Sequence, residues 1–178
     1  MTTHLATLSL TTTAIELRRA SMDHVSAIIA LLADDPLGAS RESTESDADL
    51  QPYREAFNDI DGDPRQLLVV AVAGGEVVGT MQLTFIPGLS RRGALRAQIE
   101  AVRVRDDFRG LGLGQAMFGW AIGEAQRRGC VMIQLTADKT RTNAHRFYTR
   151  LGFVASHEGF KLDMRSQSAV DSAEFFDA

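Results

Sequence analysis

The sequence predicts a mixed α/β (α+β) fold, in which one central sheet of about seven strands carries helices on its faces. Short apolar runs of strand length alternate with segments in which apolar residues recur at helical spacing. The 178 residues correspond to about one domain. The chain is 44% hydrophobic and 24% charged, which is typical of a globular protein with its own core.

The N-terminal half is expected to begin with a strand, two helices and a hairpin. These elements are a strand at 15–18, helices at 21–33 and 50–60, and strands at 66–73 and 77–86. Ser21 can cap the first helix because its hydroxyl can accept a hydrogen bond from a first-turn amide. The β-branched run 66–73 predicts a buried strand, and Gly74-Gly75 predicts the turn that follows it.

The C-terminal half is expected to continue with alternating helices and strands. These elements are a loop at 90–96, a strand at 98–104, a helix at 112–128, a strand at 131–136, a helix at 143–150, and strands at 153–155 and 160–164. The wide apolar arc of the helix at 112–128 predicts that it lies flat on the sheet. We therefore expect an N-terminal extension (1–14), a single domain (15–164) and a polar, acidic C-terminal tail (165–178).

Charge and cysteine content exclude several classes of protein. The net charge of −4 argues against a general nucleic-acid binder. The longest apolar runs have seven residues, whereas a membrane-spanning helix needs about 20. The single cysteine, Cys130, cannot form an internal disulfide, and the threonine-rich start does not resemble a signal peptide, so we expect a cytoplasmic protein. Residues 103–150 carry a net charge of +5, which indicates either an anionic ligand or solvated helix faces.

The most informative segment is 98–114, where a strand enters a turn with Gly110, Gly112 and Gly114 and a helix follows. Glycine lets a ligand approach the backbone closely, and the first amide groups of a helix have no partner within it. Together with the helix dipole, these amides predict a phosphate site, with Arg109 at its entrance. The Gly-Lys-Ser/Thr ending of a Walker A loop is absent, and the glycine spacing differs from that of a dinucleotide fold.

The segment Arg109-Gly110-Leu111-Gly112-Leu113-Gly114 resembles the signature of the GNAT superfamily of acyl-CoA-dependent N-acetyltransferases. That signature is Gln or Arg, two residues, Gly, one residue, then Gly or Ala. The segment 143–153 is similar to the family's second signature, which has an Asn, a helix bearing Phe-Tyr and then Leu-Gly-Phe. The resemblance covers about residues 15–164 and implies a mostly antiparallel sheet that splays in the middle to form a cleft.

The resemblance also implies a cosubstrate, acetyl-CoA, and residues that bind it. The implied cofactor-binding residues are Val102, Arg103, Val104, Arg109, Gly110, Leu111, Gly112, Leu113, Gly114 and Asn143. Backbone amides from Arg109 to Gly114 would bind the pyrophosphate, and Val102 and Val104 would pair with the pantetheine arm. Tyr148 matches the family's general acid, which protonates the leaving thiolate. The alternative for Tyr148 is a half-buried structural tyrosine, and the alternative for Asn143 is a helix N-cap.

Glu100 is the candidate general base. Strand alternation predicts that Glu100 and Val102 lie on one face, and an ammonium group must lose a proton before it can attack a thioester. The alternative is a structural carboxylate bound to strand-end amides or to an arginine.

The expected activity is direct transfer of acetyl from acetyl-CoA to a primary amine of a small molecule or peptide. The segment 34–63, with ten acidic and two basic residues, suggests a cationic acceptor; the alternative is a solvated, charged loop. The spacing of His, Cys, Asp and Glu implies no metal. Family relatives are often homodimers. The alternative function is a non-catalytic acyl-CoA-binding sensor or partner domain.

Overall fold

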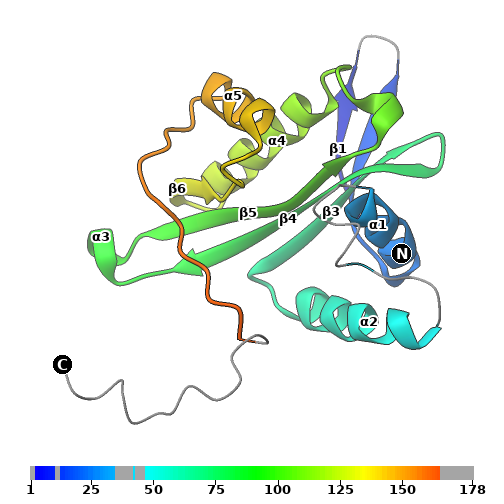
Figure 1. Cartoon of the computed structure of the whole chain (residues 1–178), viewed down its shortest axis with the longest axis horizontal. Coiled ribbons are helices and arrows are strands. Elements are labelled where there is room, and N and C mark those ends of the chain that lie inside the picture. Colours follow the sequence, from blue (N-terminus) through cyan, green and yellow to red (C-terminus); the bar gives the residue numbers. More distant parts are fainter. Residues whose placement is uncertain (1–2, 11–12, 35–41, 43–46, 165–178) are drawn as a thin grey trace. The chain divides into compact units, whose positions relative to one another are not determined.

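Among the residues that the structure describes, six strands form one sheet in the order β1-β2-β3-β4-β5-β6 (Figure 1). The computed structural model describes residues 3–10, 13–34, 42 and 47–164. The chain divides into two units, Met1–Ala137, which contains the sheet, and Asp138–Ala178. The strands are β1 (His4–Ser9), β2 (Ala14–Arg19), β3 (Gln66–Ala73), β4 (Glu76–Pro87), β5 (Leu95–Val104) and β6 (Cys130–Leu135). The helices are η1 (Met22–His24), α1 (Val25–Ala33), α2 (Asp47–Gly62), α3 (Ser90–Gly93), η2 (Asp106–Phe108), α4 (Leu113–Arg127) and α5 (Thr142–Arg150).

The predicted mixed α/β fold is confirmed, and the described part of the chain contains six strands rather than the expected seven or so. Strands β1 to β5 pair antiparallel with their neighbours, whereas β5 and β6 pair in parallel. The strands expected at 153–155 and 160–164 were wrong, because those residues have no regular structure and Phe160 is 94% exposed. Strand β1 was not expected at all. A short apolar run becomes a strand only where a partner strand can pair with it, and His4–Ser9 pairs with β2.

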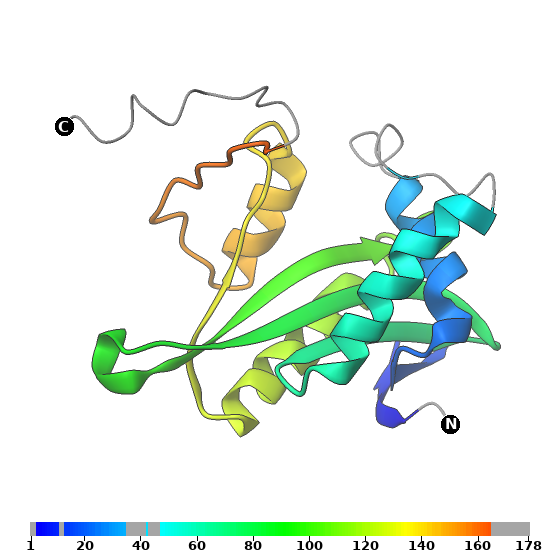
Figure 2. The same cartoon turned by 90° about the horizontal axis from the view of Figure 1, so that it is seen from below.

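Helices cover the two faces of the sheet in the first unit (Figures 1 and 2). One face carries α1 and α2, whose apolar side chains pack in one buried cluster with Leu68, Val70 and Val72 of β3. The other face carries α4, where a Cβ at Gly79 would lie 3.2 Å from the Sδ of Met117. Glycine at this position therefore permits close packing of α4 on β4.

The second half of β5 has no strand partner on its β6 side among the described residues. The parallel pairing with β6 runs from Leu95 to Ile99 and ends where β6 ends, at Leu135. Residues 100–104 therefore leave an unpaired strand edge, which corresponds to the expected splay of the sheet. Within the part of the chain that the structure describes, we find no helix with the length and apolarity that crossing a membrane requires.

Candidate functional site

The loop before α4 has the backbone geometry of an anion site. Gly110 and Gly112 have φ angles of 77° and 87°, and a Cβ at either position would meet no atom within 4 Å. The first backbone hydrogen bond of α4 runs from the amide of Ala116 to the carbonyl of Gly112, at 3.0 Å. The amides that precede Ala116 in the first turn therefore have no acceptor within the helix and point out of its N-terminus. This arrangement suits a phosphate group.

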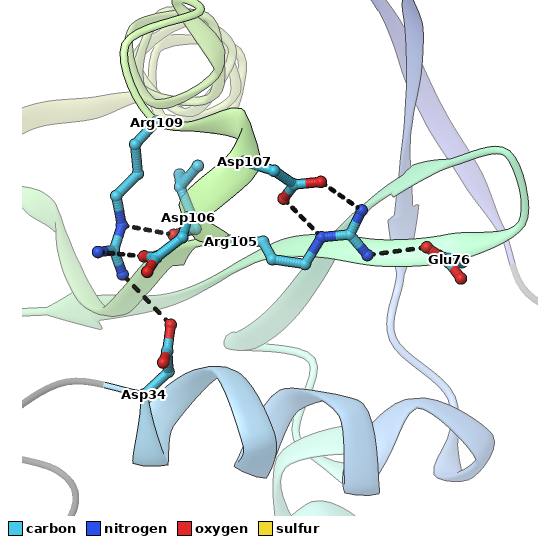
Figure 3. A network of polar contacts seen from close by, with 7 residues as sticks. Asp34, Glu76, Arg105, Asp106, Asp107 and Arg109 are labelled. Carbon is cyan, nitrogen blue, oxygen red and sulfur yellow. Dashed lines mark hydrogen bonds and ion pairs between the residues drawn. The ribbon is translucent and has the colours of Figure 1, made fainter.

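Arg109 braces this loop against two other elements (Figure 3). Its Nε donates to the carbonyl of Val104, at 3.0 Å, and so ties the loop to the end of β5. Its guanidinium also pairs with Asp106 and, at 3.5 Å, with Asp34 just after α1. The side chain is thus held by two carboxylates, and its positive charge is largely offset. Arg109, which was expected to place a positive charge at the entrance of the glycine loop, therefore mainly holds the loop in position.

Arg105 forms a second brace beside it (Figure 3). Its Nε and Nη2 donate to the carboxylate of Asp107, at 2.7 and 2.9 Å, and its Nη1 donates to Glu76, at 2.8 Å. These bonds raise the pKa of Arg105 and lower the pKa of Asp107 from its ordinary value. The network joins η2 to the start of β4, which stiffens the strand-to-loop connection.

A β-bulge in β5 places Glu100. Glu100 pairs with Gln82 of β4, whereas Arg103 pairs with Thr80, so two residues of β5 face one of β4. The bulge residue Ala101 has a φ of 51°, a left-handed conformation that costs about 1–2 kcal/mol outside glycine. Because alternation is interrupted here, the expectation that Glu100 and Val102 share a face was wrong. Glu100 instead shares its face with Arg103.

The Glu100 side chain is exposed, and its carboxylate makes no hydrogen bond or ion pair with any described residue. The alternative role, a carboxylate held by strand-end amides or by an arginine, therefore finds no support in residues 3–10, 13–34, 42 and 47–164. An exposed carboxylate on a strained strand is available to accept a proton from a ligand.

The unpaired edge of β5 beyond Ile99 could accept an extended ligand. The carbonyl of Val102 accepts from Nη1 of Arg103, at 2.8 Å, and the carbonyl of Val104 accepts from Arg109. Each carbonyl keeps a second lone pair, so these bonds do not exclude pairing with a ligand. The side chain of Arg103 thus contacts the backbone of its own strand at the position where the pantetheine arm is expected.

The second unit contains Tyr148 and Asn143 on α5. The Tyr148 ring is half-buried and packs edge-on against Phe147 and Phe153, with ring centroids 5.5 and 6.1 Å away. The suggestion that Asn143 caps the helix was wrong. The N-cap is Arg141, and the Asn143 side chain accepts from Arg146. Within this unit, hydrogen bonds from Thr140 lower the pKa of Asp138.

The first unit brings together Glu100, the unpaired edge of β5 and the glycine loop, whereas Tyr148 and Asn143 belong to the second unit. Their assignments as site residues stay predictions. The acidic segment 34–63 lies partly outside the described residues, at 35–41 and 43–46. Among the described residues, no group of three His, Cys, Asp or Glu side chains could hold a metal ion. Sequence reasoning missed the Arg109–Asp34 pair and the bulge, because both depend on residues distant in the sequence.

Comparison with known proteins identifies the family. Residues 28–153 match the family model described as "Acetyltransferase (GNAT) family". An aminoalkylphosphonate N-acetyltransferase from Salmonella typhimurium is 30% identical over 145 residues, which cover 82% of this chain and 88% of that protein. A glucosamine 6-phosphate N-acetyltransferase from Trypanosoma brucei brucei is 31% identical over 90 residues, which cover 51% of this chain and 59% of that protein.

A solved structure extends the similarity to the fold. The crystal structure of a transcriptional regulator from Bacillus halodurans C-125 superposes with a TM-score of 0.79. It is 43% identical and covers 83% of this chain and 98% of that one. The family match covers β3 to β6, the glycine loop and α5 together, and so the chain belongs to the acetyltransferase (GNAT) family.

Proposed function

We propose that this protein transfers an acetyl group from acetyl-CoA to the primary amine of a small molecule, by direct attack within a ternary complex. One observation carries the proposal: the glycine loop at the N-terminus of α4 adjoins strand β5. Within the described residues, part of one edge of β5 is unpaired and the exposed Glu100 has no partner. The loop would bind the diphosphate of acetyl-CoA, and the strand edge would bind the pantetheine arm. Family membership supports the same reading.

In the proposed reaction, Glu100 accepts a proton from the acceptor's ammonium group, either directly or through a water molecule. The free amine then attacks the thioester carbon, and a backbone amide at the bulge, that of Val102, stabilises the negative charge on the carbonyl oxygen. The new C–N bond forms, the C–S bond breaks, and Tyr148 donates a proton to the departing thiolate. The nitrogen loses its second proton, which restores the Tyr148 hydroxyl, and Glu100 releases its proton to solvent. The products are the acetylated amine, CoA and one proton.

We further propose that the acceptor carries a phosphonate or phosphate group in addition to its amine. Two relatives are named for such acceptors, an aminoalkylphosphonate and glucosamine 6-phosphate. The cationic acceptor suggested by the acidic segment 34–63 stays a prediction, and the assay below compares the two classes.

A thiol-release assay with a panel of amines tests the proposed function. Acetyl-CoA would be incubated with 2-aminoethylphosphonate, glucosamine 6-phosphate, spermidine and ethanolamine, and free CoA would be measured. We expect turnover with the two phosphorus-bearing amines to exceed turnover with ethanolamine and spermidine. CoA release that is greatest with spermidine would instead support the cationic acceptor.

A second candidate function is an acyl-CoA sensor that controls a partner. The protein of known structure that is 43% identical is described as a transcriptional regulator, which favours this reading. Calorimetric binding of acetyl-CoA combined with no CoA release on any amine would support the sensor and contradict the enzyme.

Replacement of Tyr148 with Phe is expected to lower kcat by about 10- to 100-fold, since a positioned general acid contributes on that order. The Kd for acetyl-CoA should change little, because the ring and its contacts with Phe147 and Phe153 are kept. Steady-state kinetics together with calorimetry would measure both. An unchanged kcat would exclude Tyr148 as the acid.

A further inference from the structure

The face of the sheet that carries Glu100 changes character from strand to strand. Under α1 and α2 this face is apolar, with Leu68, Val70 and Val72 of β3 in the buried cluster. From the start of β3 across β4, β5 and β6, the same face carries mainly polar residues. The strand pairings align its polar residues across the sheet: Gln66, Gln82, Thr84, Arg96, Gln98, Glu100 and Gln134. Below we call these seven residues the polar face.

Hydrogen bonds order this polar face. The side-chain oxygen of Gln66 accepts from Gln82, at 3.1 Å, and from the hydroxyl of Thr84, at 2.8 Å. Gln134 of β6 donates to Gln98 of β5, at 2.7 Å. Sheet surfaces that serve only to pack against helices are apolar, and buried polar groups must be satisfied. Half-buried glutamines held in fixed orientations are instead suited to contact a polar ligand.

Arg96 stands at one end of the polar face, with an unsatisfied donor. It lies on β5 between Ile86 and Met132, its partners on the neighbouring strands, both of which are apolar. Its Nε is buried and has no hydrogen-bond partner among the described residues. A buried donor without an acceptor is costly, and a guanidinium beside apolar neighbours favours an anion with oxygen atoms.

The spacing along β5 relates Arg96 to the candidate base. Arg96, Gln98 and Glu100 alternate on one face, so the Cα atoms of the two ends lie about 13 Å apart. Both end residues have long side chains that can approach each other over Gln98. A molecule with an amine at one end and an anionic group at the other can therefore contact Glu100 and Arg96 together.

We infer that Arg96 binds the phosphonate or phosphate group of the acceptor and so determines acceptor specificity, an inference that rests on the proposed function. The guanidinium donates to two phosphoryl oxygens, and the amine then lies beside Glu100. Gln98 lies between these two ends and can donate to the acceptor with its amide group.

The test compares acceptors with and without the anionic group in two variants. In Arg96→Gln, kcat/KM for 2-aminoethylphosphonate should fall about 10- to 100-fold, mainly through KM, since one charge-assisted contact is worth that much. With ethanolamine, which lacks the phosphonate, the change should stay below about threefold. Arg96→Lys should recover part of the loss, because it keeps the charge without the planar fork. Arg92→Gln removes an exposed arginine from the connection between β4 and β5 and should leave kcat/KM unchanged for both acceptors.

Equal losses with both acceptors in Arg96→Gln would overturn the inference, because they would indicate a structural role. An unchanged preference for the phosphonate would overturn it as well. Calorimetry with 2-aminoethylphosphonate in the presence of CoA separates this inference from the proposed function. One outcome is that no amine releases CoA, while the wild-type protein binds the phosphonate and Arg96→Gln does not. This outcome would support the anion site at Arg96 and contradict the proposed acetyl transfer. If the wild-type protein does not bind 2-aminoethylphosphonate, the proposed anion site at Arg96 is wrong.

Discussion

Replacement of Glu100 with Gln is expected to lower kcat by about 100- to 1000-fold, within the range that a positioned general base contributes. Glutamine is nearly isosteric and cannot accept a proton from the acceptor's ammonium group. The exposed side chain has no partner among the described residues, so its replacement should leave the melting temperature unchanged. Steady-state kinetics and thermal unfolding would measure the two effects.

The pH dependence of the same variant provides a more specific readout. Without an internal base, the reaction depends on amine that is already neutral in solution. The kcat/KM of Glu100→Gln should therefore keep rising up to the pKa of the acceptor amine, about 10. Glu16→Gln makes the same charge change on β2, in a residue paired with Arg18, and should behave as wild type. A kcat within a few-fold of wild type would assign the base to another group.

Replacement of Gly112 with Ala is expected to weaken acetyl-CoA binding by more than about 100-fold. Its φ of 87° is strained for any residue with a Cβ, so the loop must shift and at least two amide contacts with the diphosphate are lost. Each such contact with a charged group is worth about 1.5–3 kcal/mol. Calorimetric titration with acetyl-CoA and with CoA would measure the loss.

Gly74→Ala is a matched control for this experiment. Gly74 lies in the β3–β4 turn with a φ of 57°, and, as at Gly112, a Cβ there meets no atom within 4 Å. Both substitutions should therefore cost a similar free energy of unfolding, about 1–2 kcal/mol. Only Gly112→Ala should change acetyl-CoA binding. If both variants bind acetyl-CoA as well as wild type, the diphosphate is not held at this loop.

Several elements could be predicted from local sequence because their signals lie within a few residues. The β-branched run at 66–73 is strand β3 with the predicted bounds, and the apolar arc at 112–128 forms α4 within one residue at each end. The glycine loop was predicted for the same reason, since alternating glycines before an apolar helix are a local pattern. Its φ angles at Gly110 and Gly112 require glycine, as that pattern implies.

The sequence by itself thus determined the order of the longer helices and strands between residues 14 and 150, and the glycine loop before α4. Tertiary structure alone decided that residues 4–9 form a strand while 153–164 do not, and that a bulge at Ala101 separates the faces of Glu100 and Val102. It also left the Nε of Arg96 buried beside two apolar neighbours, Ile86 and Met132. The physical reason is that periodicity and turn chemistry act between near neighbours, whereas register, burial and unsatisfied donors depend on which distant strands pair.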